Sequence, residues 1–281
     1  MIDRMRSFGR THDQIRPVKV LVDPYGYAAA SILLELGNTK VLCAVDMQQG
    51  VPPFLRGKKV GWLKAEYNML PASTPTRFAR ESSACVKNGR LVEISRLIGR
   101  SLRSILDLTV IGERTITIDC EVLQADGGTR TACITGASLA LWYAAERWKA
   151  SGEVTGTLVR DQIAAVSVGI RNDMVLLDLD CAEDNAIDAD FNFVLTKSGS
   201  IVEIQGTAEN KTVSWPHFTQ MCTLATKGID DFFQQLAGHH AHALSENNDK
   251  QLLHHKKVPL FSLANRIAGK RNDDGPLNVP Q

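Results

Sequence analysis

The residues with the clearest chemical potential stand together at positions 127–130, which read Gly-Gly-Thr-Arg. The two glycines have no side chains, so a ligand can approach their backbone N–H groups closely. Thr129 adds a hydroxyl, and Arg130 adds a planar fork of donors that suits a tetrahedral oxyanion. Apolar residues at helical spacing follow, which predicts that the cluster caps a helix over residues 131–150, where free N–H groups and the helix dipole favour an anion. A glycine turn with an exposed arginine explains the four residues equally well.

Charge is distributed unevenly along the 281 residues, although the formal net charge is only +1. Residues 54–103 hold eleven lysines and arginines against three acids, a balance that suits a polyanion. Residues 178–190 hold six acids and no base, which suits a divalent cation. One face of the helix predicted over residues 90–107 carries three arginines: Arg96, Arg100 and Arg103. That face is interpreted either as a solvated stripe or as an RNA contact.

The elements that must position these residues follow from hydrophobic periodicity. In the first half, strands are predicted at residues 18–22, 39–45 and 115–122, with a loop-rich segment over residues 50–90. In the second half, hairpins are predicted over residues 163–179 and 191–205, before a helix from about 216 to 237 that Gly228 could break. Strands followed by a helix in each half predict an α+β fold, with helices packed against mostly antiparallel sheets.

Three regions are expected along the chain. They are an N-terminal half with the basic RNA and phosphate segment (1–150), a C-terminal half with an acidic metal site (151–238), and a polar tail (239–281). The tail holds five of the seven histidines. We expect it to be flexible, with metal binding by the histidines as the alternative.

Composition also argues against several kinds of protein. No run approaches the ~18 apolar residues that a membrane span needs. The N-terminus lacks the apolar core of a signal peptide, so we expect a cytoplasmic protein with no membrane partner. The six cysteines are scattered and form no Cys-x-x-Cys pair, so neither a zinc site nor a disulfide framework is expected.

Longer segments of the sequence are similar to one known family. The matching segments are residues 14–18 (Gln-Ile-Arg-Pro-Val), 37–43, 65–71 (Ala-Glu-Tyr-Asn-Met-Leu-Pro), 96–103, 119–132, 164–170 and 205–209 (Gln-Gly-Thr-Ala-Glu). Over about residues 8–237, the chain resembles the ribonuclease PH family of phosphate-dependent 3′-to-5′ exoribonucleases.

The resemblance implies a fold of two β-α-β modules like the second domain of ribosomal protein S5, assembled as a homohexameric ring, a trimer of dimers. The implied reaction is phosphorolysis: inorganic phosphate attacks the last phosphodiester at an RNA 3′ end and releases a nucleoside diphosphate. The reverse reaction adds nucleotides. The implied substrates are tRNA precursors and other structured RNA 3′ ends.

The resemblance also implies roles for individual residues. Phosphate would be held by Arg90, Gly128, Thr129 and Arg130. Asp184 and Asp190 would bind the cation, Mg²⁺ or Mn²⁺, and support catalysis, while Arg77 and Arg80 would grip the tRNA acceptor end. The chemistry agrees, because arginines and a helix N-terminus offset the repulsion between an anionic nucleophile and a phosphodiester. Our hypothesis is that Asp190 protonates the departing 3′-oxygen.

Some positions depart from the family pattern. Ala72 stands where bacterial members often have arginine, and residues 82–88 lack the usual Gly-Lys, so the RNA grip and the loop before Arg90 are expected to differ. Two other functions fit parts of the sequence: an inactive ring subunit that still binds RNA, and a purely structural RNA-binding module. The retained arginines and aspartates argue against the first, and the six clustered acids argue against the second.

Overall fold

The computed structural model describes residues 6–80 and 88–250, with side chains described as far as Leu236 in the last helix. The chain divides into two compact units between His240 and Ala241, and apart from the end of the last helix everything below concerns the first. Most of the atypical segment at residues 82–88 and of the histidine-rich tail lies outside the described residues. None of the described helices combines the length and the apolarity needed to cross a membrane.

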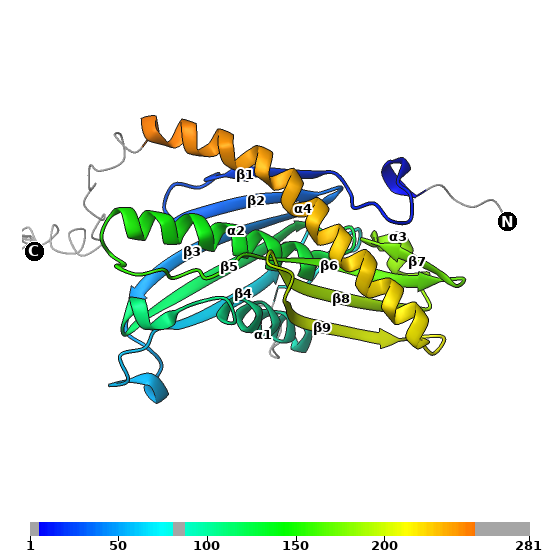
Figure 1. Cartoon of the computed structure of the whole chain (residues 1–281), viewed down its shortest axis with the longest axis horizontal. Helices are drawn as coiled ribbons and strands as arrows, with labels where there is room; N and C mark the ends of the chain where they lie inside the picture. Colours follow the sequence, from blue (N-terminus) through cyan, green and yellow to red (C-terminus); the bar gives the residue numbers. More distant parts are fainter. Residues whose placement is uncertain (1–5, 81–87, 251–281) are drawn as a thin grey trace, which may run out of the picture. The chain divides into compact units, whose positions relative to one another are not determined.

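The first sheet has five strands in the order β1-β2-β3-β5-β4 (Figure 1). Their bounds are β1 Val18–Val22, β2 Ala30–Leu36, β3 Thr39–Gln49, β4 Trp62–Met69 and β5 Arg114–Gln124. Neighbours are antiparallel except β4 and β5, which run parallel. Short 3₁₀ turns lie at Ser7–Gly9, Pro53–Leu55 and Leu108–Ile111.

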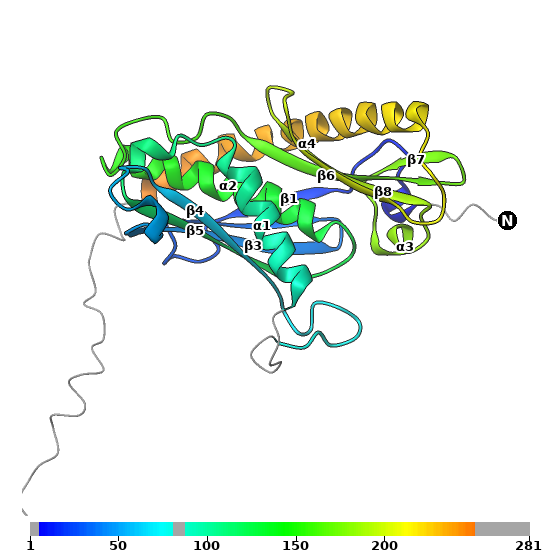
Figure 2. The same cartoon turned by 90° about the horizontal axis from the view of Figure 1, so that it is seen from below.

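The prediction of loop over residues 50–90 is wrong where it covers β4. Prolines flank this strand rather than interrupt it, and Leu63 and Tyr67 are buried along it. Helix α1, Gly89–Arg103, crosses from β4 to β5 and completes a β-α-β unit (Figure 2). It buries Leu91, Ile94, Leu97, Ile98 and Leu102 and ends four residues before the predicted boundary.

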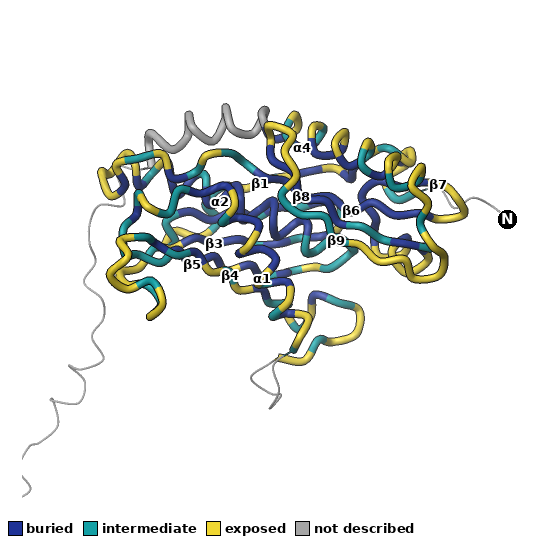
Figure 3. The backbone as a smooth tube through the Cα atoms, turned by 60° about the horizontal axis from the view of Figure 1, so that its bottom comes forward, coloured by how far each residue is buried: buried dark blue, intermediate teal, exposed yellow. Residues whose placement is uncertain are grey.

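Helix α2, Thr129–Ala150, lies between the two sheets and contacts β2, β3 and β5 of the first and β6 of the second. It is buried along most of its length, as expected for a helix that has no solvent face (Figure 3). Its hydroxyls also bind β6: Thr135 Oγ1 accepts from the Ala165 N–H and Ser138 Oγ from the Ile163 N–H, each at 3.0 Å.

The second sheet has four strands in the order β7-β6-β8-β9. Their bounds are β6 Ile163–Arg171, β7 Met174–Leu177, β8 Ala189–Thr196 and β9 Ile201–Ala208, and a short helix α3, Cys181–Asp184, joins β7 to β8. Both predicted hairpins are confirmed, because β6 pairs with β7 and β8 with β9, all antiparallel. The predicted fold class, α+β with mostly antiparallel sheets and packed helices, is confirmed.

Helix α4, Trp215–Lys250, covers part of the second sheet and extends past its predicted end. The Phe218 ring lies 5.7 Å from that of Phe191 on β8. Gly228 does not break the helix. A Cβ at Gly228 would lie 2.8 Å from Leu177 Cδ1, so this glycine is a close packing contact rather than a helix end.

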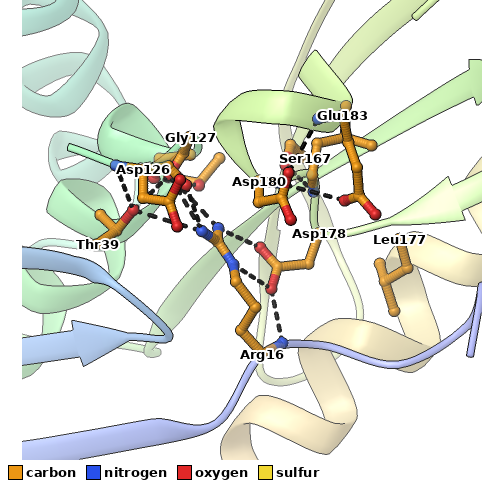
Figure 4. A network of polar contacts seen from close by, with 12 residues as sticks. Arg16, Thr39, Asp126, Gly127, Ser167, Leu177, Asp178, Asp180 and Glu183 are labelled. Carbon is orange, nitrogen blue, oxygen red and sulfur yellow. Dashed lines mark hydrogen bonds and ion pairs between the residues drawn. The ribbon is translucent and has the colours of Figure 1, made fainter. Parts of the chain in front are cut away.

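A buried ion pair joins the segment before β1 to the residue that follows β7 (Figure 4). Arg16 donates from Nε and an Nη to the two carboxylate oxygens of Asp178 at 2.9 and 2.7 Å, and its backbone N–H binds the same carboxylate at 2.7 Å. The two residues are 0% and 1% exposed. Removing one partner of such a pair leaves a buried charge uncompensated, which is far costlier than losing a surface contact.

We therefore expect Asp178→Asn to lower the free energy of unfolding by about 3 kcal/mol. Urea unfolding of both proteins would measure it. The matched control is Glu66→Gln, which removes an exposed contact with Lys64 and should cost under about 1 kcal/mol. Equal effects of the two changes would show that the buried pair contributes no more than a surface pair.

Candidate active site

The Gly-Gly-Thr-Arg cluster forms the N-terminus of α2, as predicted, but the helix begins at Thr129, two residues before the predicted start. Gly128 is the N-cap residue, and Thr129 and Arg130 already lie in the first helical turn. Gly127 and Gly128 both have left-handed backbone angles, φ 75° and 64°, which favour glycine. Within the described chain, no group accepts from the N–H of Gly128, Thr129 or Arg130, as expected for a first turn that can bind an anion.

Contacts from three segments hold this turn in place. Arg16 donates to the carbonyl of Asp126 at 2.6 Å, and the Thr39 hydroxyl donates to the carbonyl of Gly127 at 2.7 Å. On the other side, Gly127 packs against the backbone just before α3, where an added Cβ would lie 2.6 Å from the carbonyl carbon of Asp180. The turn therefore packs between Thr39 of the first sheet and the acidic segment of the second half.

Thr129 and Arg130 each have a neutral partner. The Thr129 hydroxyl lies 2.9 Å from the hydroxyl of Tyr67 on β4, and Arg130 donates to Gln205 Oε1 on β9 at 2.8 Å. Burial, and to a lesser extent the Cys133 thiol, raise the pKa of the Tyr67 hydroxyl, although Thr129 and two arginines oppose the shift. The tyrosine is therefore a neutral hydroxyl at physiological pH.

Arg90 enters the site from the first turn of α1. The Asn88 side chain caps that helix by accepting from the Arg90 N–H at 3.0 Å. The Arg90 side chain is exposed, and its charge acts on both the Tyr67 hydroxyl and the Asp184 carboxyl. Two arginines from different helices thus face the same region.

Asp184 ends α3 and Asp190 lies at the start of β8, and Asp184 is close enough to Arg90 and Arg130 for their charges to act on its carboxyl. Burial raises the pKa of the Asp184 carboxyl, and the negative charges of Asp190 and Glu209 raise it further. Arg90 and Arg130 oppose this shift. The structure therefore gathers the predicted phosphate ligands and the predicted catalytic carboxylates into one site.

The other four acids of residues 178–190 are bound by groups of the chain itself. The number of carboxylates left for a cation is therefore smaller than the six predicted from the sequence. Asp178 is bound by Arg16, and Glu183 accepts from Arg6 Nε at 2.6 Å. Asp180 caps α3 through the Glu183 N–H and lies 3.9 Å from Arg10. Asp188 accepts from the Asn172 N–H and from Lys211 at 3.1 and 3.3 Å.

Asp184 and Asp190 remain as the carboxylates of this segment that lack an ion pair within the described chain. Mg²⁺ is commonly held by one or two carboxylates together with water and substrate phosphates, and this pair fits that pattern. No group of three His, Cys, Asp or Glu side chains gathers at metal-binding spacing in the parts of the chain that the structure describes.

Other predicted residues lie outside this centre. Arg77 and Arg80 are exposed on the loop after β4, where the charge of Arg80 acts on Glu121. Two arginines of the α1 face have partners within the chain: Arg100 donates to Glu203 at 2.9 Å, and the Arg103 guanidinium lies 4.5 Å over the Trp62 ring. Arg96 and Arg100 are nonetheless exposed, which fits the solvated stripe, and an RNA contact of this face stays a prediction.

Three residues near the centre had no predicted role: Tyr67, Gln205 and Glu209. All three stand in segments that match the family, and that match was the signal that could have found them. The hydrogen bonds of Tyr67 and Gln205 join positions more than 60 residues apart, which local sequence patterns do not encode.

Comparison with known proteins identifies the family of the chain. Residues 14–145 match the model of domain 1 of the 3′ exoribonuclease family, and residues 161–228 match that of domain 2. A Ribonuclease PH of Neisseria meningitidis is 49% identical over 236 residues, which cover 84% of this chain and 96% of the relative. A Ribonuclease PH of Syntrophomonas wolfei is 48% identical over 226 residues, or 80% and 95% of the two chains.

Solved structures show the same fold at lower sequence identity. A chain of the Archaeoglobus fulgidus exosome, solved with RNA bound to the active site, has a TM-score of 0.69 at 23% identity and covers 83% of this chain and 93% of its own length. Rice (Oryza sativa) Rrp46 has a TM-score of 0.65 at 20% identity, covering 82% and 98%.

The raised pKa of Asp184 makes a prediction about stability. Folding favours the protonated carboxyl, so the ionised form destabilises the fold above the folded-state pKa, and this effect disappears as the pH falls below the ordinary carboxyl range. In chelator, we expect Asp184→Asn to raise the melting temperature at pH 7, with a gain that shrinks towards pH 4.

The control is Asp188→Asn, which loses attractive contacts with Lys211 and the Asn172 N–H. This variant should melt at a lower temperature than the parent at pH 7. A loss of stability in Asp184→Asn at neutral pH would contradict the repulsive environment described for that carboxyl.

Proposed function

The chain belongs to the 3′ exoribonuclease family, and we propose that it is a phosphorolytic 3′-to-5′ exoribonuclease that trims tRNA precursors and other structured RNA 3′ ends in the cytoplasm. The observation that carries the proposal is the joint placement of Arg90, Arg130 and the α2 N-terminus beside Asp184 and Asp190. An anion site next to a carboxylate pair is what phosphate needs in order to attack a phosphodiester. A hydrolase uses water as the nucleophile, so it would need no anion site besides the one for the scissile phosphodiester.

In this mechanism the N-terminal half supplies the phosphate ligands. Arg90, Arg130, the Thr129 hydroxyl and the N–H groups at Gly128 hold inorganic phosphate and reduce its repulsion from the RNA. One phosphate oxygen attacks the terminal phosphorus, the bond from phosphorus to the 3′-oxygen breaks, and a nucleoside diphosphate leaves. The same steps in reverse add a nucleotide.

The C-terminal half supplies the carboxylates. We propose that Asp184 and Asp190 hold a divalent cation, Mg²⁺ or Mn²⁺, which stabilises negative charge on the scissile phosphate. Asp190 is proposed to protonate the departing 3′-oxygen. Arg77 and Arg80, both exposed on the loop after β4, are proposed to contact the RNA backbone upstream of the cleaved nucleotide.

The test is degradation of a tRNA that carries a short 3′ extension, in the presence of Mg²⁺, with and without inorganic phosphate. We expect nucleotide release only with phosphate, and the products should be nucleoside diphosphates by chromatography. Release of monophosphates without phosphate would instead mean hydrolysis. RNA binding with no release under either condition would favour an inactive ring subunit.

Two variants separate the two halves of the site. Arg130→Met removes charge-assisted hydrogen bonds worth about 1.5–3 kcal/mol, so the KM for phosphate should rise about tenfold or more. Asp190→Asn should lower kcat by about 100-fold or more while phosphate still raises the melting temperature of the variant. Loss of phosphate binding in Asp190→Asn would assign that residue to structure instead.

We also propose that the protein assembles as a homohexameric ring, a trimer of dimers. Three apolar side chains on or after the edge strand β1 support a contact with another copy: Leu21, Tyr25 and Tyr27 are 55%, 58% and 105% exposed. Exposed apolar groups that cluster on one edge mark interfaces. Light scattering after size exclusion should give six chain masses, and Leu21→Glu with Tyr27→Glu should give a smaller species. An unchanged mass would place the interface elsewhere.

A further inference from the structure

Arg130 is held by a short chain of polar side chains that crosses three elements. Its guanidinium donates to Gln205 Oε1 on β9 at 2.8 Å, and Gln205 Nε2 donates to Glu93 Oε1 on α1 at 3.0 Å. Because a carboxylate only accepts and a guanidinium only donates, the Gln205 amide has one orientation that satisfies both neighbours. Glu93 therefore sets the amide so that its oxygen faces Arg130.

The identity of the partner matters for an anion site. A carboxylate in the place of the Gln205 oxygen would form an ion pair with Arg130 and offset its positive charge. An amide oxygen fixes the guanidinium and leaves its net charge, together with its other N–H donors, for a phosphate. Within the described chain, Arg130 has no ion pair.

Thr129 is held by the same kind of contact. Tyr67 is 2% exposed on β4, and its hydroxyl lies 2.9 Å from Thr129 Oγ1. If the tyrosine donates, the Thr129 hydroxyl hydrogen is directed to another acceptor, and an anion at the α2 N-terminus is such an acceptor. With Tyr67 as the donor, the Thr129 hydroxyl is left to donate to the anion.

We propose that Gln205 and Tyr67 are positioning residues of the phosphate site, each orienting one phosphate ligand through a hydrogen bond without net charge. This inference rests on the proposed function, because it assigns the anion as inorganic phosphate. Neither residue contacts the RNA or the reacting atoms in this proposal. Their effect should appear in phosphate affinity and not in RNA affinity.

The experiment compares two substitutions at position 205 in the full-length protein. Gln205→Met keeps the length of the side chain without its polarity, whereas Gln205→Glu is closer in shape but adds a negative charge beside Arg130. We expect the KM for phosphate to rise about threefold in Gln205→Met and about tenfold or more in Gln205→Glu. The KM for RNA, and kcat at saturating phosphate, should change less than about twofold.

A merely structural role would lower the melting temperature of each variant along with its phosphate affinity, because Gln205→Met removes both hydrogen bonds and Gln205→Glu also sets a carboxylate against Glu93. Equal effects of the two substitutions, or a larger effect of Gln205→Met, would overturn the assignment of Gln205. Gln205 is only half-buried on the edge strand β9, so both variants are expected to fold. Their melting temperatures without phosphate check this.

The assignment of Tyr67 is tested by a double-mutant cycle with Thr129. Tyr67→Phe should raise the KM for phosphate about threefold to fivefold in the parent protein and should have no further effect in Thr129→Val. Equal effects of Tyr67→Phe in both backgrounds would mean that the tyrosine does not act through Thr129.

A binding measurement separates this inference from the proposed function. Titration calorimetry with inorganic phosphate, in the absence of RNA, measures the site without turnover. If the parent binds phosphate but releases no nucleoside diphosphate, the proposed activity is wrong, while the ranking of the variants by affinity still decides the roles of Gln205 and Tyr67. If the parent does not bind phosphate, both proposals are wrong.

Discussion

The buried pair of Arg16 and Asp178 is the constraint on which the rest of the site depends. It brings together the segment before β1, the turn before α2 and the segment between β7 and α3, three parts of the chain that share no sequence neighbourhood (Figure 4). A buried ion pair contributes little net stability compared with apolar residues of the same volume, and its better-attested effect is to specify one arrangement over others. Here that arrangement sets the α2 N-terminus against the acidic segment.

The same region contains two sets of charges, one paired within the protein and one that forms no ion pair in the described chain. Arg6, Arg10 and Arg16 neutralise the acids that face the N-terminal segment. Arg90 and Arg130 approach from α1 and α2 on the side of Asp184 and Asp190, where the described chain forms no ion pair. The charges that face the N-terminal segment are paired and buried, and those at Arg90, Arg130, Asp184 and Asp190 are left for the ligands proposed above. This division follows from where each element ends, because Asp178 precedes α3 and Asp184 closes it.

How far the sequence predicts this structure depends on whether the information is local. The α2 cap could be predicted, because glycines followed by an apolar helical pattern are a local signal, and both hairpins of the second half followed from turns between apolar runs. Strand β4 was missed because its flanking prolines and charges resemble those of a loop, while its burial comes from α1, which follows it in sequence. The sequence around Gly228 suggests a break in the helix, because the contact with Leu177 that explains this glycine forms only across the fold. The six acids look like one cluster in the sequence, because composition does not reveal that Asp178, Asp180 and Glu183 have arginine partners more than 160 residues away.

The long sequence separation within the Arg16–Asp178 pair has a consequence for how the protein is made. The two residues are 162 positions apart, so the pair forms only after most of the chain has left the ribosome. Until then, the Gly127 turn lacks the backbone of Leu179 and Asp180 against which it packs. Long-range contacts of this kind form late in folding, and N-terminal regions emerge first during synthesis. An incomplete chain therefore carries the basic segment while the Gly127 turn still lacks its support, and the α2 N-terminus reaches its final arrangement only after the second half has been made.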